Sequence, residues 1–410
     1  MKKSFHGWWI VFAACFTFGL STGIPYYNIG FFYDYIARDF NWTREQVTLG
    51  FPLAAAMTIW IGPLVIARFS PRILILIGTA LTCIALVGFG QMPGVLWIYY
   101  GFWVLYTIGY FLSGPPPHQI IVSQWYRRNR GKAMAIVYVG VGLMGSLGSF
   151  IVKPLTEAFG YHVALCILGG MLFLSWPLVI FVMKDKPSDM GQNPDGDDEP
   201  PAETHVVAKT FKELMASKSF WLLLLGSLCS IGSIGAVNFH MKFVFLDEGF
   251  TKGGMVDGAW RTASILILWS SIAGRLSIGY FSDRFSKKWV MFVTYFIVAA
   301  TIPLLLKVRP DDNFFLYAFA IMFGFGMGAD YMMIPLMAAD QFGVNSLARA
   351  MAVILPVNTI GQTWFPYLVS VLRTSLGNYE NAMTVVLCVA LVGAAAIGFL
   401  PKHKSFSEAK

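Results

Sequence analysis

Long uninterrupted runs of apolar residues constrain the fold of this chain more than any other feature. A bilayer core about 30 Å thick requires about 20 helical residues to cross it, and twelve runs of about that size occur. They cover residues 7–34, 47–67, 73–91, 96–123, 132–155, 163–183, 219–243, 258–281, 289–306, 313–339, 350–372 and 380–400. With 56% apolar and 13% charged residues, the chain does not have the composition of a soluble enzyme. We predict an all-α membrane protein with twelve transmembrane helices.

The distribution of lysine and arginine predicts the orientation of these helices. Of the 30 basic residues, 20 lie at the two termini and in alternate connections, and 8 lie in the other connections. Cytoplasmic loops carry the excess of basic residues. We therefore expect a multi-pass protein of the cytoplasmic membrane with both termini in the cytoplasm. When the span ends are counted with the connections that they border, only Lys153 and Arg275 remain inside the predicted spans.

The two halves of the sequence resemble each other. GPLVIARFSPR at 62–72 aligns with GRLSIGYFSDR at 274–284, and QWYRRNRGKAMAIV at 124–137 aligns with QFGVNSLARAMAVI at 341–354. A parallel repeat of six spans is typical of carriers whose halves rock around a central site. We predict six-helix bundles at 1–183 and 219–410, in two pseudo-symmetric halves. Between them, 184–218 is predicted to be a cytoplasmic tether with an interfacial helix from Val206 to Ser217.

Several classes of function find no support in the sequence. The five cysteines lie in apolar runs without a CxxC pair, which indicates neither a disulfide framework nor a zinc site. No Walker loop, metal cluster or Ser/His/Asp arrangement stands out. The basic clusters follow membrane loops instead of forming a nucleic-acid surface. We therefore expect no enzyme, no cofactor, no metal and no nucleic-acid partner, and a protein that works as a monomer in the bilayer.

The glycine and arginine motifs resemble those of the major facilitator superfamily. Within it, the chain is most similar to the monocarboxylate transporter and oxalate/formate antiporter group, through residues 19–32, Arg68 with its neighbours, 125–133, and Arg275 with Gly279. The resemblance implies the twelve-helix fold in two bundles. It also implies a gating motif in the cytoplasmic loops, formed here by Gly62, Arg68, Gly274, Asp283 and Arg284.

Arg275 is the most informative of the charged residues. A charge in mid-membrane costs at least about 2.5 kcal/mol, so it usually faces a cavity or a partner. Lys153 is near the end of its span, where its side chain can reach the headgroups. In the monocarboxylate group the matching arginine anchors the substrate, and a guanidinium can hold a carboxylate through two hydrogen bonds. The alternative is a brace to Asp283, which is eight residues and about 12 Å away along a helix.

The number of buried cations predicts the charge of the substrate. The resemblance to the oxalate antiporters implies a second cation, a lysine, in the eleventh span. Residues 353–362 contain no lysine. A monoanion therefore fits this sequence better than a dianion.

Asp330 is the only carboxylate deep in a predicted span. In one interpretation it forms a static buried pair with Arg275. In the other, the substrate carboxylate takes over Arg275, and Asp330 then accepts a proton because it has lost its countercharge. Both interpretations remain open at this stage.

His118 follows Gly114 and three consecutive prolines in the fourth span. Prolines remove backbone donors and break a helix, and free carbonyls are tolerated in a membrane only against protein or water. We expect His118 to contact substrate or exchange protons; the alternative is a hydrogen-bonded core histidine. Two positions depart from the proton-coupled pattern of the family, with Tyr26 in place of a lysine and Ser271 in place of an aspartate. Proton coupling would therefore run through His118 or Asp330, or be absent.

Together these residues predict a secondary carrier of small monocarboxylates such as lactate or pyruvate, coupled to a proton and working by alternating access. Beside Arg275, the expected substrate contacts are His118, Tyr331, Ser271, Tyr27 and Asn358. Three alternatives remain: an oxalate/formate-type antiporter, an exporter of amphipathic drugs, and a non-transporting carboxylate sensor that signals through 184–218.

Overall fold

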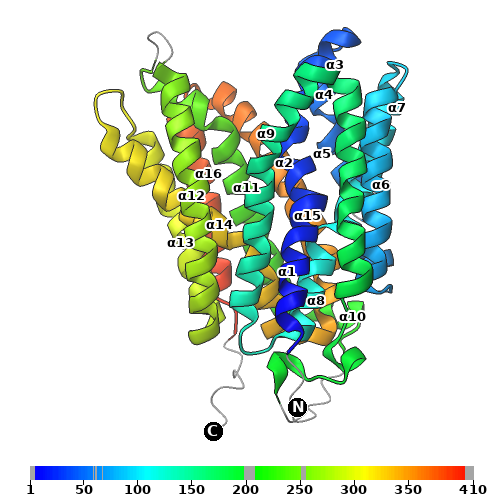
Figure 1. Ribbon diagram of the computed structural model, residues 1–410. Coiled ribbons are helices and arrows are strands. Elements are labelled where there is room, and N and C mark those ends of the chain that lie inside the picture. The colour runs from blue at the N-terminus through cyan, green and yellow to red at the C-terminus, as the bar shows by residue number, and fades with distance from the viewer. Residues whose placement is uncertain are drawn as a thin grey trace. The chain divides into compact units, whose positions relative to one another are not determined.

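The chain is helical in almost every part that the computed structural model describes, namely residues 5–58, 60, 62–66, 68–197, 208–250 and 255–401 (Figure 1). Within these ranges the only β-type pairing is an isolated bridge between Arg309 and Asp312. The chain forms two compact units. Unit 1 comprises Met1–Ala208 and Val344–Pro356, and unit 2 comprises Lys209–Gly343 and Val357–Lys410. Unit 1 thus includes most of the predicted linker and a short piece of the second half.

Unit 1 is built from helices that are often interrupted. Its elements are α1 (Gly7–Phe18), η1 (Gly19–Gly23), α2 (Ile24–Asn28), η2 (Ile29–Phe32), α3 (Tyr33–Asp39), α4 (Arg44–Thr48), α5 (Gly50–Met57), η3 (Gly62–Ile66), α6 (Pro71–Gln91), α7 (Leu96–Ser113), α8 (Pro115–Trp125), α9 (Arg130–Met171), η4 (Leu172–Ser175), η5 (Leu178–Val182), η6 (Pro187–Met190) and η7 (Pro194–Gly196). Apolar side chains from the first six spans form its core. At its start, α4 is capped by reciprocal hydrogen bonds between Thr43 and Gln46, which form a capping box.

Unit 2 has longer and more regular helices. They are α10 (Phe211–Ala216), α11 (Lys218–Asp247), α12 (Met255–Arg284), α13 (Lys287–Leu306), α14 (Asn313–Phe342), α15 (Val344–Leu376), whose first residues belong to unit 1, and α16 (Tyr379–Gly398). Residues of α11 to α16 share one apolar core. This core holds the polar side chains discussed below at fixed positions.

Eight segments of the described chain are long and apolar enough to cross a membrane. One of them, Arg130–Val182, covers two predicted spans. Gly160, with a positive φ of 77°, marks the boundary between the two helices of this segment. Three predicted spans are not among the eight. Span 47–67 is short and partly outside the described residues, span 96–123 is interrupted at Gly114, and span 350–372 lies within the more polar α15.

The first part of the predicted tether is docked on the loops of unit 1. The Asp185 carboxylate accepts hydrogen bonds from the Ser70 hydroxyl (2.5 Å) and the Arg72 amide (3.2 Å). The Asp195 carboxylate accepts from the consecutive amides of residues 127–129, at 2.8 to 3.3 Å. The segment is therefore ordered as far as residue 197. The interfacial helix is shorter than predicted: it begins at Phe211, after the Thr210 cap, and the predicted start at Val206 lies outside the described residues.

Candidate substrate site

Glycines bring α12 and α14 of unit 2 into backbone contact. A Cβ atom added to Gly274 would lie 2.2 Å from the carbonyl oxygen of Phe325. One added to Gly328 would lie 2.2 Å from the carbonyl oxygen of Ser271. Real side chains do not tolerate such distances to backbone, so only glycine permits this packing. Arg275 follows Gly274 directly, and the close contact therefore fixes its position beside α14.

Arg275 is buried, and none of the described residues pairs with it. Only 7% of its surface is exposed, and its Nε and Nη1 atoms are sealed from solvent without an acceptor among the described residues. Buried donors in folded proteins nearly always have partners, so an exception calls for an explanation. A guanidinium of this kind is suited to bind an anion such as a carboxylate.

The predicted ion pair between Arg275 and Asp330 is absent, although both residues lie in the described part of the chain. Asp330 is fully buried and accepts a hydrogen bond at Oδ2 from the Ser230 hydroxyl of α11. The buried hydroxyl of Tyr295 on α13 lies beside the same carboxyl group. Both interpretations started from this pair, so the static pair and a proton switch driven by the loss of Arg275 as countercharge are both wrong for this structure. The reason is the packing of α14, which directs the carboxyl group toward α11 and α13.

Polar side chains also join α15 to its neighbours in unit 2. The Oδ1 atom of Asn358 accepts a hydrogen bond from Ser227 (3.0 Å). Its Nδ2 donor is buried without an acceptor. The hydroxyl of Tyr331 donates to Oε1 of Gln362 (2.6 Å). These contacts place predicted site residues from α14 and α15 in one unit with Arg275.

Ser271 is the remaining predicted contact in unit 2. Its side chain is almost fully buried, and its hydroxyl donates to the carbonyl oxygen of Leu268 within α12 (2.8 Å). Its backbone forms the contact with Gly328. The structure therefore gives Ser271 a packing role in the interface of α12 and α14.

His118 is a hydrogen-bonded core residue in unit 1. It is fully buried and stacks on Phe18 with ring centroids 4.9 Å apart. Its Nδ1 atom donates to the carbonyl oxygen of Gly114 (2.8 Å), because a carbonyl can only accept. Its Nε2 atom shares a hydrogen bond with the Thr17 hydroxyl (2.8 Å). These contacts favour the interpretation as a hydrogen-bonded core histidine, and a role of His118 toward substrate or protons stays a prediction.

The proline run breaks the fourth span as predicted, and a hydroxyl of unit 1 satisfies one of the carbonyls that it frees. Gly114 separates α7 from α8 with a non-helical backbone. Prolines 115–117 provide no N–H for the carbonyls four residues earlier, at 111–113, and the carbonyl oxygen of Ser113 accepts from the Ser21 hydroxyl (2.8 Å). The carbonyl oxygen of Gly114, at the start of α8, accepts from the His118 ring.

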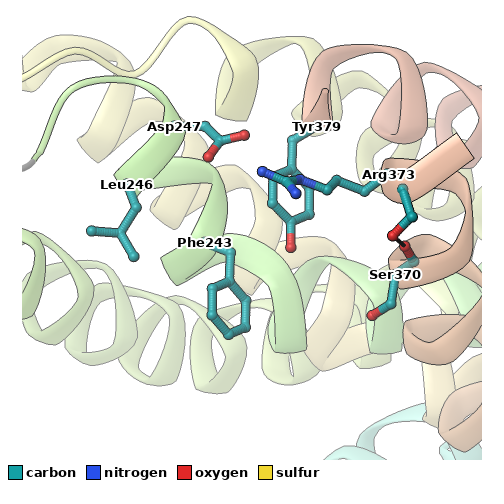
Figure 2. A pocket seen from close by; sticks show the side chains of 7 residues that line it. Phe243, Leu246, Asp247, Ser370, Arg373 and Tyr379 are labelled. Atoms are coloured by element: carbon teal, nitrogen blue, oxygen red, sulfur yellow. Dashed lines mark hydrogen bonds between the residues drawn. The ribbon is translucent and has the colours of Figure 1, made fainter. Parts of the chain in front are cut away.

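The other predicted residues are dispersed. Tyr27 is 55% exposed in unit 1. Of the gating motif, Gly62 begins a π-helical turn, Arg68 is exposed, and the guanidinium of Arg284 stacks 4.2 Å above the ring of Tyr280. Asp283 stays eight residues from Arg275 on the continuous helix α12. None of the predicted site residues lines the pocket shown in Figure 2.

Sequence reasoning missed the hydroxyls around the buried polar groups. Ser227 contacts Asn358, Ser230 contacts Asp330, and Tyr295 lies beside Asp330. A signal was present, since Ser227, Ser230 and Ser233 recur every third residue within an otherwise apolar span. Residues three apart share a helix face.

Comparisons with known proteins agree with this architecture. The chain matches the family described as Major Facilitator Superfamily over residues 11–277 and 259–410. It is 27% identical over 278 residues to the MFS transporter asaE of Aspergillus flavus, which covers 67% of this chain and 58% of that protein. It is 25% identical to monocarboxylate transporter 12 of Xenopus laevis, over 97% of this chain and 92% of that protein. The outward conformation of the transporter FucP superposes with a TM-score of 0.68 at 12% identity, over 95% and 98% of the two chains.

Proposed function

Because the chain belongs to the major facilitator superfamily, and is therefore a multi-pass membrane transporter, we propose that it carries small monocarboxylates by alternating access. The buried, unpartnered guanidinium of Arg275 carries this proposal. A monocarboxylate would supply this guanidinium with a counterion and a hydrogen-bond acceptor. The full-length similarity to a protein named monocarboxylate transporter 12 supports the same substrate class.

The surroundings of Arg275 favour a single negative charge. Among the described residues of unit 2, Arg275 is the only buried cation. The neutral amide of Asn358 is a further buried donor without an acceptor there, and the buried hydroxyl of Tyr295 lies beside Asp330. A short acid with one carboxylate and an additional oxygen, such as lactate or pyruvate, matches one cation and one neutral donor. An oxalate-type dianion would leave one charge without a counterion.

Proton coupling is proposed to run through Asp330. Its carboxyl group is fully buried, its neighbours Ser230 and Tyr295 are neutral hydroxyls, and no ion pair reaches it within the described chain. An unpaired buried charge costs several kcal/mol, and the cost disappears when the group carries a proton. A proton taken up by Asp330 on one side of the membrane and released on the other would couple transport to a pH gradient.

Uptake of labelled short carboxylates into proteoliposomes, with and without a pH gradient, tests the function. We expect the gradient to drive accumulation in the wild-type protein. Asp330→Asn mimics the protonated carboxyl group, so it should abolish this accumulation and preserve substrate exchange. Equal loss of accumulation and exchange would contradict the role of Asp330. Undiminished transport of amphipathic drugs without carboxylate flux would contradict the substrate class.

The linker distinguishes a carrier from a sensor. We propose that the carrier works as a monomer in the cell membrane with both termini in the cytoplasm. Residues 184–218 would then connect its two halves. Shortening the segment 198–207 should then leave carboxylate flux intact. A sensor that signals through the linker would have no flux to preserve.

A further inference from the structure

A second charged site lies in unit 2, where α11 and α15 end and α16 begins (Figure 2). Its cavity has a volume of about 360 Å³. The lining side chains are Phe243, Leu246, Asp247, Ser370, Arg373, Thr374 and Tyr379. In the orientation proposed above, this end of unit 2 faces the outside of the cell.

The cation of this pocket is held in place by an anchored aromatic ring. The Arg373 guanidinium lies 5.6 Å from the ring centroid of Tyr379, a cation–π contact that Figure 2 shows. The Tyr379 hydroxyl donates to Nδ1 of the buried His240 (3.1 Å). The Nε2 atom of His240 donates in turn to the carbonyl oxygen of Pro366 (2.8 Å). This chain of contacts orients Arg373 before any ligand arrives.

The two charges of the pocket have no ion-pair partner in the described chain. Neither Arg373 nor Asp247 forms an ion pair, whereas Arg309 and Glu248 pair with each other close by. Phe243 and Leu246 add exposed apolar surface beside the two charges. The pocket thus offers one cation, one anion and an apolar wall, which is the chemistry needed to bind a small amphipathic ion.

The pocket and the predicted substrate contact Asn358 share the helix α15. Arg373 is about 22 Å beyond Asn358 along the helix axis.

We propose that this pocket is a capture subsite, in which Arg373 binds the carboxylate of an incoming monocarboxylate and Asp247 rejects dicarboxylates. The inference rests on the proposed function and adds the residues that select the substrate before it reaches Arg275. A single carboxylate is matched by Arg373, with its hydrocarbon part against Phe243 and Leu246. A second carboxylate would be brought near Asp247, and juxtaposed like charges oppose binding.

The decisive measurement is the initial rate of labelled lactate uptake from the outer side at several lactate concentrations. Arg373→Gln should raise KM about fivefold, because it removes one exposed charge-assisted contact to the substrate. The maximal rate should stay within about twofold of the wild-type rate. Arg373→Lys keeps the charge and should restore most of the affinity. The matched control is Arg309→Gln, which removes one positive charge at the same end of unit 2 outside the pocket.

Asp247→Asn tests the selectivity. Succinate should not compete with lactate uptake in the wild-type protein, and it should become a competitor in this variant. An unchanged KM in Arg373→Gln, an equal rise in Arg309→Gln, or failure of succinate to compete in Asp247→Asn would each overturn the subsite. Those outcomes leave the carrier function intact if uptake still depends on Arg275. A wild-type protein without lactate flux would overturn both.

Discussion

Replacing Arg275 separates a substrate anchor from a structural brace, because the two roles predict opposite effects on stability. Arg275→Met removes the guanidinium and keeps an unbranched apolar side chain. The empty protein buries two N–H groups of this guanidinium without acceptors, and a buried unsatisfied group costs about 1–3 kcal/mol. The variant should therefore be more stable than the empty wild-type protein, by about that amount.

The same change should abolish tight substrate binding. Removing one partner of a buried, hydrogen-bonded charge pair costs about 2–4 kcal/mol, which corresponds to about 30-fold to 1,000-fold in affinity. Arg275→Lys keeps the charge and loses the planar fork of donors. It should lose about tenfold.

Two assays on the same preparations decide the matter. The midpoint of thermal unfolding is measured in detergent with and without lactate, and initial transport rates are measured in proteoliposomes. We expect Arg275→Met to raise the midpoint of the empty protein and to remove both its shift with lactate and transport. A lowered midpoint with transport reduced only in proportion to folded protein would show that Arg275 braces the helices and would refute the anchor.

Three further predictions concern packing and pH. Gly328→Ala places a Cβ atom against the backbone of Ser271 and should destabilise the protein by about 1–3 kcal/mol. Gly258 has open space around it, so Gly258→Ala should leave the stability unchanged. Chemical unfolding measures the free energy of unfolding of both variants. His118→Gln should lower the unfolding midpoint without changing the pH dependence of transport, because both ring nitrogens serve local contacts; an altered pH profile would restore a proton role. Burial raises the pKa of the Glu248 carboxyl above its ordinary 4.5. Its contribution to stability is therefore present below pH 4.5 and lost as the pH rises through the folded-state pKa. Glu248→Gln should make the unfolding midpoint less dependent on pH in that acidic range.

The packing of individual side chains explains why some expectations failed. The sequence placed Asp330 and Arg275 in the same half of the protein, at positions where a direct pair was conceivable. Their contact depended on the rotation of α14, which directs Asp330 toward Ser230 on α11. Likewise, the proline run correctly predicted a broken helix. The use of His118 to satisfy the carbonyl of Gly114 depended on local geometry that residue spacing does not specify.

The amino-acid sequence by itself determined the class of fold and the internal repeat, and it singled out Arg275 as a charge inside a span. These follow from one-dimensional properties: run length against bilayer thickness, recurring motifs, and the high free energy of a charge in apolar surroundings. Tertiary structure alone decided which buried groups are satisfied, because a hydrogen bond requires two atoms from distant segments within about 3 Å. It satisfied His118 and left Arg275 without an acceptor, and it brought Arg373 and Asp247 together in a pocket.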